Sequence, residues 1–103
     1  MTASCAVEVT NGECFVSLTG EVDLHNADVI VEWLQLAVDV PGCYSVEVDL
    51  SSLDFLDGQG ISSLLRGHRY AEARGVNFKV KQPRLIVARA LNITGADRVL
   101  GLC

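Results

Sequence analysis

The chain has 103 residues, half of them hydrophobic, and its 13 acidic and 8 basic side chains give a formal net charge of −5 at pH 7. A chain of this length can bury a core of its own, whereas two domains sharing it would each be too small to stand alone, so we interpret residues 1–103 as a single domain. The negative charge disfavours direct binding of nucleic acid, and the lack of a run of ~20 apolar residues or of a basic, signal-like N-terminus predicts a cytoplasmic protein without a membrane partner.

The first predicted element is a β-hairpin that turns at Asn11-Gly12, a dipeptide typical of two-residue hairpin loops. Such a turn sets the strand register and brings six side chains to one face, in the pairs Val9–Cys14, Val7–Val16 and Cys5–Leu18. On that face Cys5 and Cys14 are expected to act as small core hydrophobes.

The second predicted element is a helix that begins at Asn26 or a neighbour, runs to about Asp39 and is closed by Pro41-Gly42. One apolar stripe follows helical spacing along it, formed by Ala27, Ile30, Leu34 and Ala37. A second stripe consists of Val29, Trp33 and Leu36, so more of the helix surface is apolar than one contact with a sheet requires. We expect Trp33 to belong to the core rather than to an exposed contact.

The most informative stretch, residues 46–65, predicts a buried strand, a tight turn and an apolar helix in direct succession. Hydrophobic residues alternate with acidic ones from Val46 to Leu50, and the turn Asp57-Gly58-Gln59-Gly60 follows. The helix after the turn is expected to end at Gly75, a natural left-handed C-cap. Asp57 is suited to cap this helix, and the same turn is suited to be a docking surface that another backbone approaches closely.

The C-terminal third predicts a short strand around Val76 to Val80, which Pro83 ends. A helix from Leu85 to Asn92 and a final turn between residues 96 and 100 follow. The predicted order ββαβαβα indicates an α/β fold, an open mixed sheet of about four strands with helices packed on it.

Known catalytic and ligand motifs are poorly matched. Ser63 stands where a dinucleotide-binding motif starting at Gly58 needs its third glycine, and no phosphate-loop motif is present. The cysteines form no C-x-x-C pair and have no ligand-like spacing to either histidine. We therefore expect no enzyme, no cofactor and no metal site.

Three segments and one glycine together resemble the STAS domain, the family of sulphate transporters and anti-sigma factor antagonists: Gly20-Glu21-Val22-Asp23, Asp49-Leu50-Ser51, Phe55-Leu56-Asp57 and Gly60. The resemblance covers nearly the whole chain and implies the same element order. In bacterial antagonists of this type, a serine follows the Asp, and then come Ser or Thr and Gly. Phosphorylation of that serine by the partner anti-sigma kinase ends their complex. Here Gly58 and Gln59 occupy those two positions, so position 58 has no hydroxyl to accept a phosphoryl group.

The resemblance implies an antagonist that binds a kinase-type anti-sigma factor and so releases a sigma factor, without phosphorylation control at Gly58. The expected contact surface centres on the turn, with an upstream acidic residue and the outer side of the following helix: Asp57, Gly58, Gln59 and Gly60, with Asp23, Ser62, Arg66 and Arg69. Tyr70 lies alongside the last two. If phosphorylation control has moved, the candidates are Ser52, Ser62 and Ser63.

An alternative interpretation is a STAS-like module that senses or scaffolds, either by holding a small ligand at the turn or by binding other STAS chains. A thiol-based control through Cys43 and Cys103, both expected to be exposed, also stays open. The oligomeric state is left open by the sequence.

Overall fold

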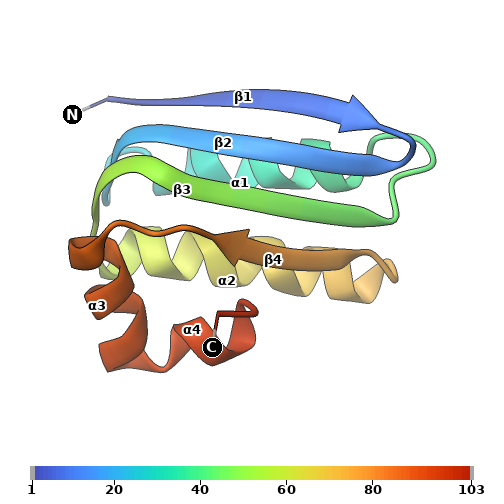
Figure 1. Ribbon diagram of the computed structural model, residues 1–103. Helices are drawn as coiled ribbons and strands as arrows, with labels where there is room; N and C mark the ends of the chain where they lie inside the picture. The colour runs from blue at the N-terminus through green and yellow to red at the C-terminus, as the bar shows by residue number, and fades with distance from the viewer. Residues whose placement is uncertain (1, 103) are drawn as a thin grey trace.

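The computed structural model describes residues 2–102 and has the predicted α/β architecture (Figure 1). Its four-stranded sheet has the order β1-β2-β3-β4, formed by β1 (Ala3–Thr10), β2 (Glu13–Val22), β3 (Ser45–Leu56) and β4 (Asn77–Lys81). β1 is antiparallel to β2, and the other neighbours are parallel, so the sheet is mixed as expected. The helices are α1 (Ala27–Val38), α2 (Gly58–Ala73), α3 (Leu85–Thr94) and the short α4 (Ala96–Val99).

Figure 1 shows α1 and α2 side by side on one face of the sheet, with α3 and α4 beyond β4. The core lies between these helices and the inward side chains of the strands, and α3 and α4 add to it through Val87, Leu91, Ala96 and Leu100. The C-terminal segment also covers the outer edge of β4, where the Val80 amide donates to the Leu100 carbonyl at 3.0 Å. The predicted order ββαβαβα is confirmed, with α4 as the final turn.

The hairpin register is confirmed residue by residue, including Cys14 opposite Val9 and Cys5 opposite Leu18. Asn11 and Gly12 both have positive φ, 51° and 84°, as a type I′ turn requires. Cys14 is fully buried, but the expectation for Cys5 is only partly correct because its side chain is half-buried. The physical reason is that α1 packs over β2 and β3, which leaves the edge strand β1 incompletely covered.

Helix α1 confirms the predicted bounds, with Asn26 as N-cap and Asp39 as C-cap. The first apolar stripe is buried as expected, whereas the second is not, since Leu36 is 67% exposed and Trp33 is half-buried. The expectation of a core tryptophan is therefore wrong in degree: Trp33 packs at the margin of the core, against the uncovered edge of the sheet.

Strand β3 is the central element, and it continues through residues 51–56 to the start of α2 rather than ending near Leu50. It is hydrogen-bonded on both sides, and its inward residues Val46, Val48 and Leu50 are fully buried. Because β3 ends at Leu56 and α2 begins at Gly58, the turn between them is fixed at one end of the sheet. The central strand thus positions the turn that the sequence singles out.

Candidate functional site

The Asp57–Gly60 turn links the end of β3 to the first turn of α2. The Asp57 side chain is the N-cap of α2, and its Oδ1 accepts a hydrogen bond from the Gly60 amide at 2.9 Å. Its own amide donates to the Val22 carbonyl at 3.2 Å, which ties the turn to the end of β2. The capping interpretation of Asp57 is confirmed, and hydrogen bonds hold the turn both to the end of β2 and to the first turn of α2.

The two glycines of the turn have opposite surroundings. Gly60 is buried, and a Cβ atom there would lie 2.4 Å from Leu56 Cδ1 and 3.0 Å from Val22 Cγ1. Gly58 is exposed, and a Cβ atom there would meet no atom within 4 Å. Close packing therefore requires glycine at position 60 but not at position 58. Gln59 is exposed between them, so positions 58 and 59 together form the accessible crown of the turn.

The outer side of α2 continues from this crown. Ser62 is partly exposed, whereas Arg66 and Arg69 are exposed at helical spacing from it. Arg66 Nη1 lies 3.4 Å from Asp28 Oδ1 on α1, a surface ion pair that contributes little to stability but links the two helices. Tyr70 belongs to a different group, because its hydroxyl donates to the Asp39 carboxylate and its ring carries the Arg74 guanidinium. The hydrogen bond to Asp39 is the main cause that raises the Tyr70 pKa.

The three serines considered for a displaced phosphorylation site differ in access. Ser63 is fully buried, and its hydroxyl donates to the Gly60 carbonyl at 2.6 Å. Ser62 is partly exposed on the outer side of α2, and Ser52 is exposed on β3. A kinase can approach Ser62 and Ser52 in the folded chain, whereas Ser63 is shielded by the packing of α2 on the sheet.

Asp23 lies in the turn between β2 and α1 and is only 7% exposed. Its Oδ1 accepts from the His25 amide at 2.9 Å, and its amide donates to Asn26 Oδ1 at 2.9 Å. These bonds give Asp23 a clear role in shaping the turn. They also leave Leu24 projecting, with 69% of its surface exposed. Because Val22 contacts the Asp57 amide, this loop lies next to the crown of the α2 turn.

Leu24 is a candidate contact residue that the sequence reasoning missed. It falls outside the buried stripe of α1 and between Asp23 and His25, in a turn where a large apolar side chain has no structural requirement. That mismatch with the helical pattern is the signal that could have found it. An exposed leucine beside two accessible backbone positions is of the type that a protein partner covers.

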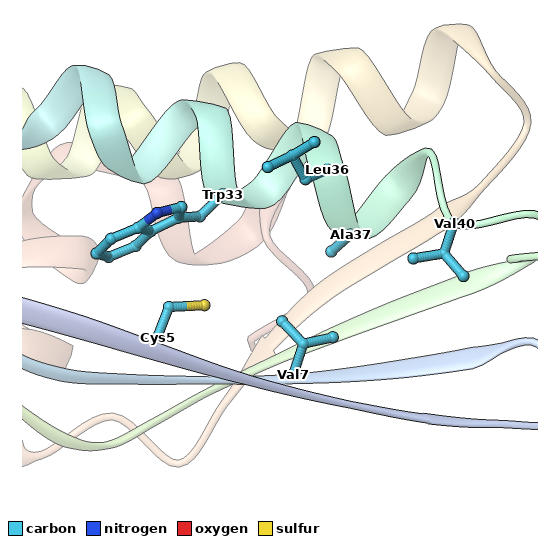
Figure 2. A pocket seen from close by; sticks show the side chains of 6 residues that line it. All are labelled: Cys5, Val7, Trp33, Leu36, Ala37 and Val40. Atoms are coloured by element: carbon cyan, nitrogen blue, oxygen red, sulfur yellow. The ribbon is translucent and has the colours of Figure 1, made fainter.

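An apolar hollow of about 390 Å³ lies away from this surface, between β1 and α1 (Figure 2). Cys5 and Val7 line it from the strand, and Trp33, Leu36 and Ala37 line it from the helix, with Val40 just beyond. Burial raises the pKa of the Cys5 thiol, so that thiol stays protonated at neutral pH. This apolar hollow therefore lies apart from the turn, the position that the alternative interpretation predicts for a small ligand.

The role of Asp57 as a cap predicts a specific pair of outcomes. Asp57→Ala should lower the free energy of unfolding by about 0.5–2 kcal/mol, because the Gly60 amide loses its acceptor. Asp57→Asn should stay within about 0.5 kcal/mol of the parent, because asparagine caps equally well. Urea denaturation of both variants measures this. Equal losses in the two variants would show that the carboxylate charge, and not the cap bond, is what stabilises the turn.

Among residues 2–102, no helix has both the length and the apolar character needed to cross a membrane.

The two cysteines that the sequence suggests for thiol control have different outcomes. Cys43 is half-buried rather than exposed, and Cys103 lies outside the described residues.

Comparison with known proteins gives consistent results. The family model described as "Mlab, STAS domain" matches residues 5–102. An anti-sigma F factor antagonist of Paenibacillus polymyxa is 24% identical over 100 residues, which cover 97% of this chain and 86% of the relative. The crystal structure of an anti-sigma factor antagonist from Mycobacterium paratuberculosis has a TM-score of 0.86 at 24% identity, covering 98% of this chain and 85% of the other. The anti-sigma factor antagonist SpoIIAA in its unphosphorylated form has a TM-score of 0.75 at 22% identity, covering 97% of this chain and 99% of the other.

Proposed function

The chain belongs to the STAS domain family, and on that premise we propose that it is an anti-sigma factor antagonist that binds a kinase-type anti-sigma factor in the cytoplasm and so releases a sigma factor. The name of the Paenibacillus relative and those of the two solved structures support this class of function. The protein acts by binding and not by catalysis. Its docking surface comprises the crown of the α2 turn, the outer side of α2 and the neighbouring loop: Asp57, Gly58, Gln59, Ser62, Arg66 and Arg69, with Leu24. Gly60 and Asp23 are buried beneath this surface and contribute by shaping its backbone rather than by direct contact.

The observation that carries the proposal is the exposure of Gly58 and Gln59 at the start of α2. A partner can approach the backbone there without displacing any side chain, since the position of a Cβ atom on Gly58 is open. Gly60 beneath them is held against Leu56 and Val22, so the docking backbone is fixed in place before binding. A preformed surface of this kind loses little conformational entropy when it is covered.

The same position separates this chain from relatives that are switched by phosphorylation. Phosphorylation adds a charge of about −1.5 to −2 and requires a hydroxyl as acceptor. Gly58 offers none, and the shielded hydroxyl of Ser63 is already bonded within the helix. Binding to the anti-sigma factor is therefore constitutive with respect to position 58.

The proposal predicts that the chain binds an anti-sigma factor and keeps its mass in the presence of ATP. Each kinase-type anti-sigma factor of the host, purified in turn, is titrated with the chain by calorimetry. The matching one is then incubated with the chain and ATP. We expect no added phosphate by intact mass and a change in affinity of less than about threefold, because no phosphoryl charge is introduced.

A gain-of-function variant supplies the matched control. Gly58→Ser combined with Gln59→Thr restores the family's acceptor pattern, in a position where the added atoms meet open space. This variant should gain one phosphate and then lose binding. Phosphate mapped to Ser62 or Ser52 of the parent chain would show that control had moved. Nucleotide binding by the chain without affinity for any anti-sigma factor would contradict the proposal and favour a sensing module.

A further inference from the structure

Two cysteines that are 29 positions apart in the sequence meet in the folded chain. The Sγ atoms of Cys14, near the start of β2, and Cys43, in the loop between α1 and β3, lie 3.4 Å apart. Cys5 is elsewhere, in the apolar hollow between β1 and α1. The Cys14–Cys43 contact is at the beginning of β3, whereas the Asp57 turn follows the end of the same strand, so the two sites are at opposite ends of the sheet (Figure 1).

Backbone hydrogen bonds hold the two cysteines in register independently of their side chains. The Tyr44 amide donates to the Gly12 carbonyl at 2.9 Å, and Ser45 pairs with Glu13 in the parallel ladder. The residues next to each cysteine are thus bonded to one another. Because an S–S bond is about 2.05 Å long, the sulfur atoms need to approach by only about 1.4 Å, a movement within reach of side-chain rotation.

The two thiols differ in their access to solvent. Cys14 is fully buried, and its pKa is raised to about 11 by burial, by its hydrogen bond to Cys43 and by the charge that Cys43 can carry. Cys43 is half-buried and flanked by the exposed residues Gly42 and Tyr44. An oxidant therefore meets Cys43 first, while Cys14 stays protonated beside it with its Sγ directed at Cys43.

We propose that Cys14 and Cys43 are an oxidative modification site, which forms an intramolecular disulfide when the chain meets a hydroperoxide. In the first step the Cys43 thiolate attacks one peroxide oxygen, the O–O bond breaks, and the leaving oxygen takes up a proton, which leaves a sulfenic acid on Cys43. In the second step the Cys14 sulfur attacks Cys43 Sγ, the S–O bond breaks, and the Cys14 proton leaves with the hydroxide as water. Two thiols lose two electrons in total, and hydrogen peroxide is reduced to two waters.

The disulfide closes a loop that contains the whole of α1 and joins β2 to the segment that begins β3. Such a cross-link stabilises the fold chiefly by restricting the unfolded chain, and a loop of this length lies in the range where the effect is substantial. The Asp57 turn lies at the far end of β3, so oxidation should leave the proposed docking surface unchanged. This proposal does not depend on the proposed function, so an experiment on the disulfide and an experiment on anti-sigma factor binding can give independent results.

The test treats the reduced 103-residue chain with hydrogen peroxide and alkylates the remaining thiols after denaturation without reductant. We expect a loss of two hydrogen masses, a cross-linked peptide pair containing Cys14 and Cys43, and a melting temperature raised by roughly 5–15 °C. Cys5→Ser and Cys103→Ser variants should form the same cross-link, whereas Cys43→Ser should not. A sulfinic acid on Cys43 with Cys14 still free, or a cross-link to Cys103 instead, would overturn the proposal. So would a cross-link that forms faster in the urea-unfolded chain than in the folded one.

Discussion

Replacement of Gly67 by leucine should lower the free energy of unfolding by about 3 kcal/mol, because α1 and α2 pack against each other at this residue. A Cβ atom on Gly67 would lie 2.8 Å from Leu34 Cδ1, 3.1 Å from Leu34 Cβ and 3.4 Å from Phe78 Cζ. Leu34 is fully buried in the core between the helices and the sheet. The larger side chain therefore forces the helices apart or drives neighbouring side chains out of their preferred rotamers. Urea denaturation monitored by circular dichroism measures the loss.

Two controls separate this packing effect from helix propensity. Gly58→Ala adds a methyl group in open space within the same helix, so it should be neutral or stabilising by up to about 1 kcal/mol. Leu34→Ala in the Gly67→Leu background removes the side chain that the new leucine would strike. The double variant should therefore lose less free energy of unfolding than the sum of the losses of the two single variants. An unchanged unfolding midpoint for Gly67→Leu would mean that the helices do not approach as closely as the structure has them.

Replacement of Gly58 by glutamate should weaken binding of the anti-sigma factor by about 100-fold or more while leaving the fold at least as stable. The added carboxylate lies at the crown of the turn, beside Asp57, at the position that the family resemblance assigns to the phosphorylated serine. A charge that is buried without a partner in an interface costs several kcal/mol, and 100-fold corresponds to about 2.7 kcal/mol. A negative charge in the first turn of α2 is in contrast favourable for the helix dipole, and glutamate is a better helix former than glycine.

Gly58→Ala is the matched control for binding as well, since it adds bulk without charge and should keep the affinity within about threefold. Calorimetric titration of both variants and the parent against the same anti-sigma factor gives the comparison. Raised salt should recover part of the lost affinity of the glutamate variant if charge is the cause. Unimpaired binding by Gly58→Glu would place the partner on another surface and would remove Gly58 from the site.

Much of the fold could be predicted because local signals agree with the tertiary arrangement. Asn11-Gly12 determines the hairpin register, since both residues must adopt positive φ, and the register then follows by counting along the strands. The bounds of α1 follow from its buried stripe and from the residues that flank it. Asp57 could be predicted as a cap because a carboxylate directly before an apolar helix has a local function that no distant contact changes.

The remaining features depend on which elements lie next to each other, and no local pattern contains that information. The half-burial of Cys5 and Trp33 follows from the position of α1 over β2 rather than β1. The contact between Cys14 and Cys43 arises because the loop after α1 returns to the hairpin turn, where Tyr44 bonds to Gly12. The docking role of the predicted site residues stays a prediction, since a surface has no internal contacts that reveal what covers it.

Gly58 and Gly60 are two positions apart but have different roles. Gly60 is required by the packing of the turn, whereas Gly58 determines whether the turn can accept a phosphoryl group. A change at position 60 would have to be accommodated by the packing of Leu56 and Val22, whereas position 58 accepts a side chain without any adjustment of the fold. A hydroxyl that accepts a phosphoryl group can therefore be gained or lost at position 58 without disturbing the fold. Evolution can vary the acceptor at this position, whereas packing restricts what it can place at position 60.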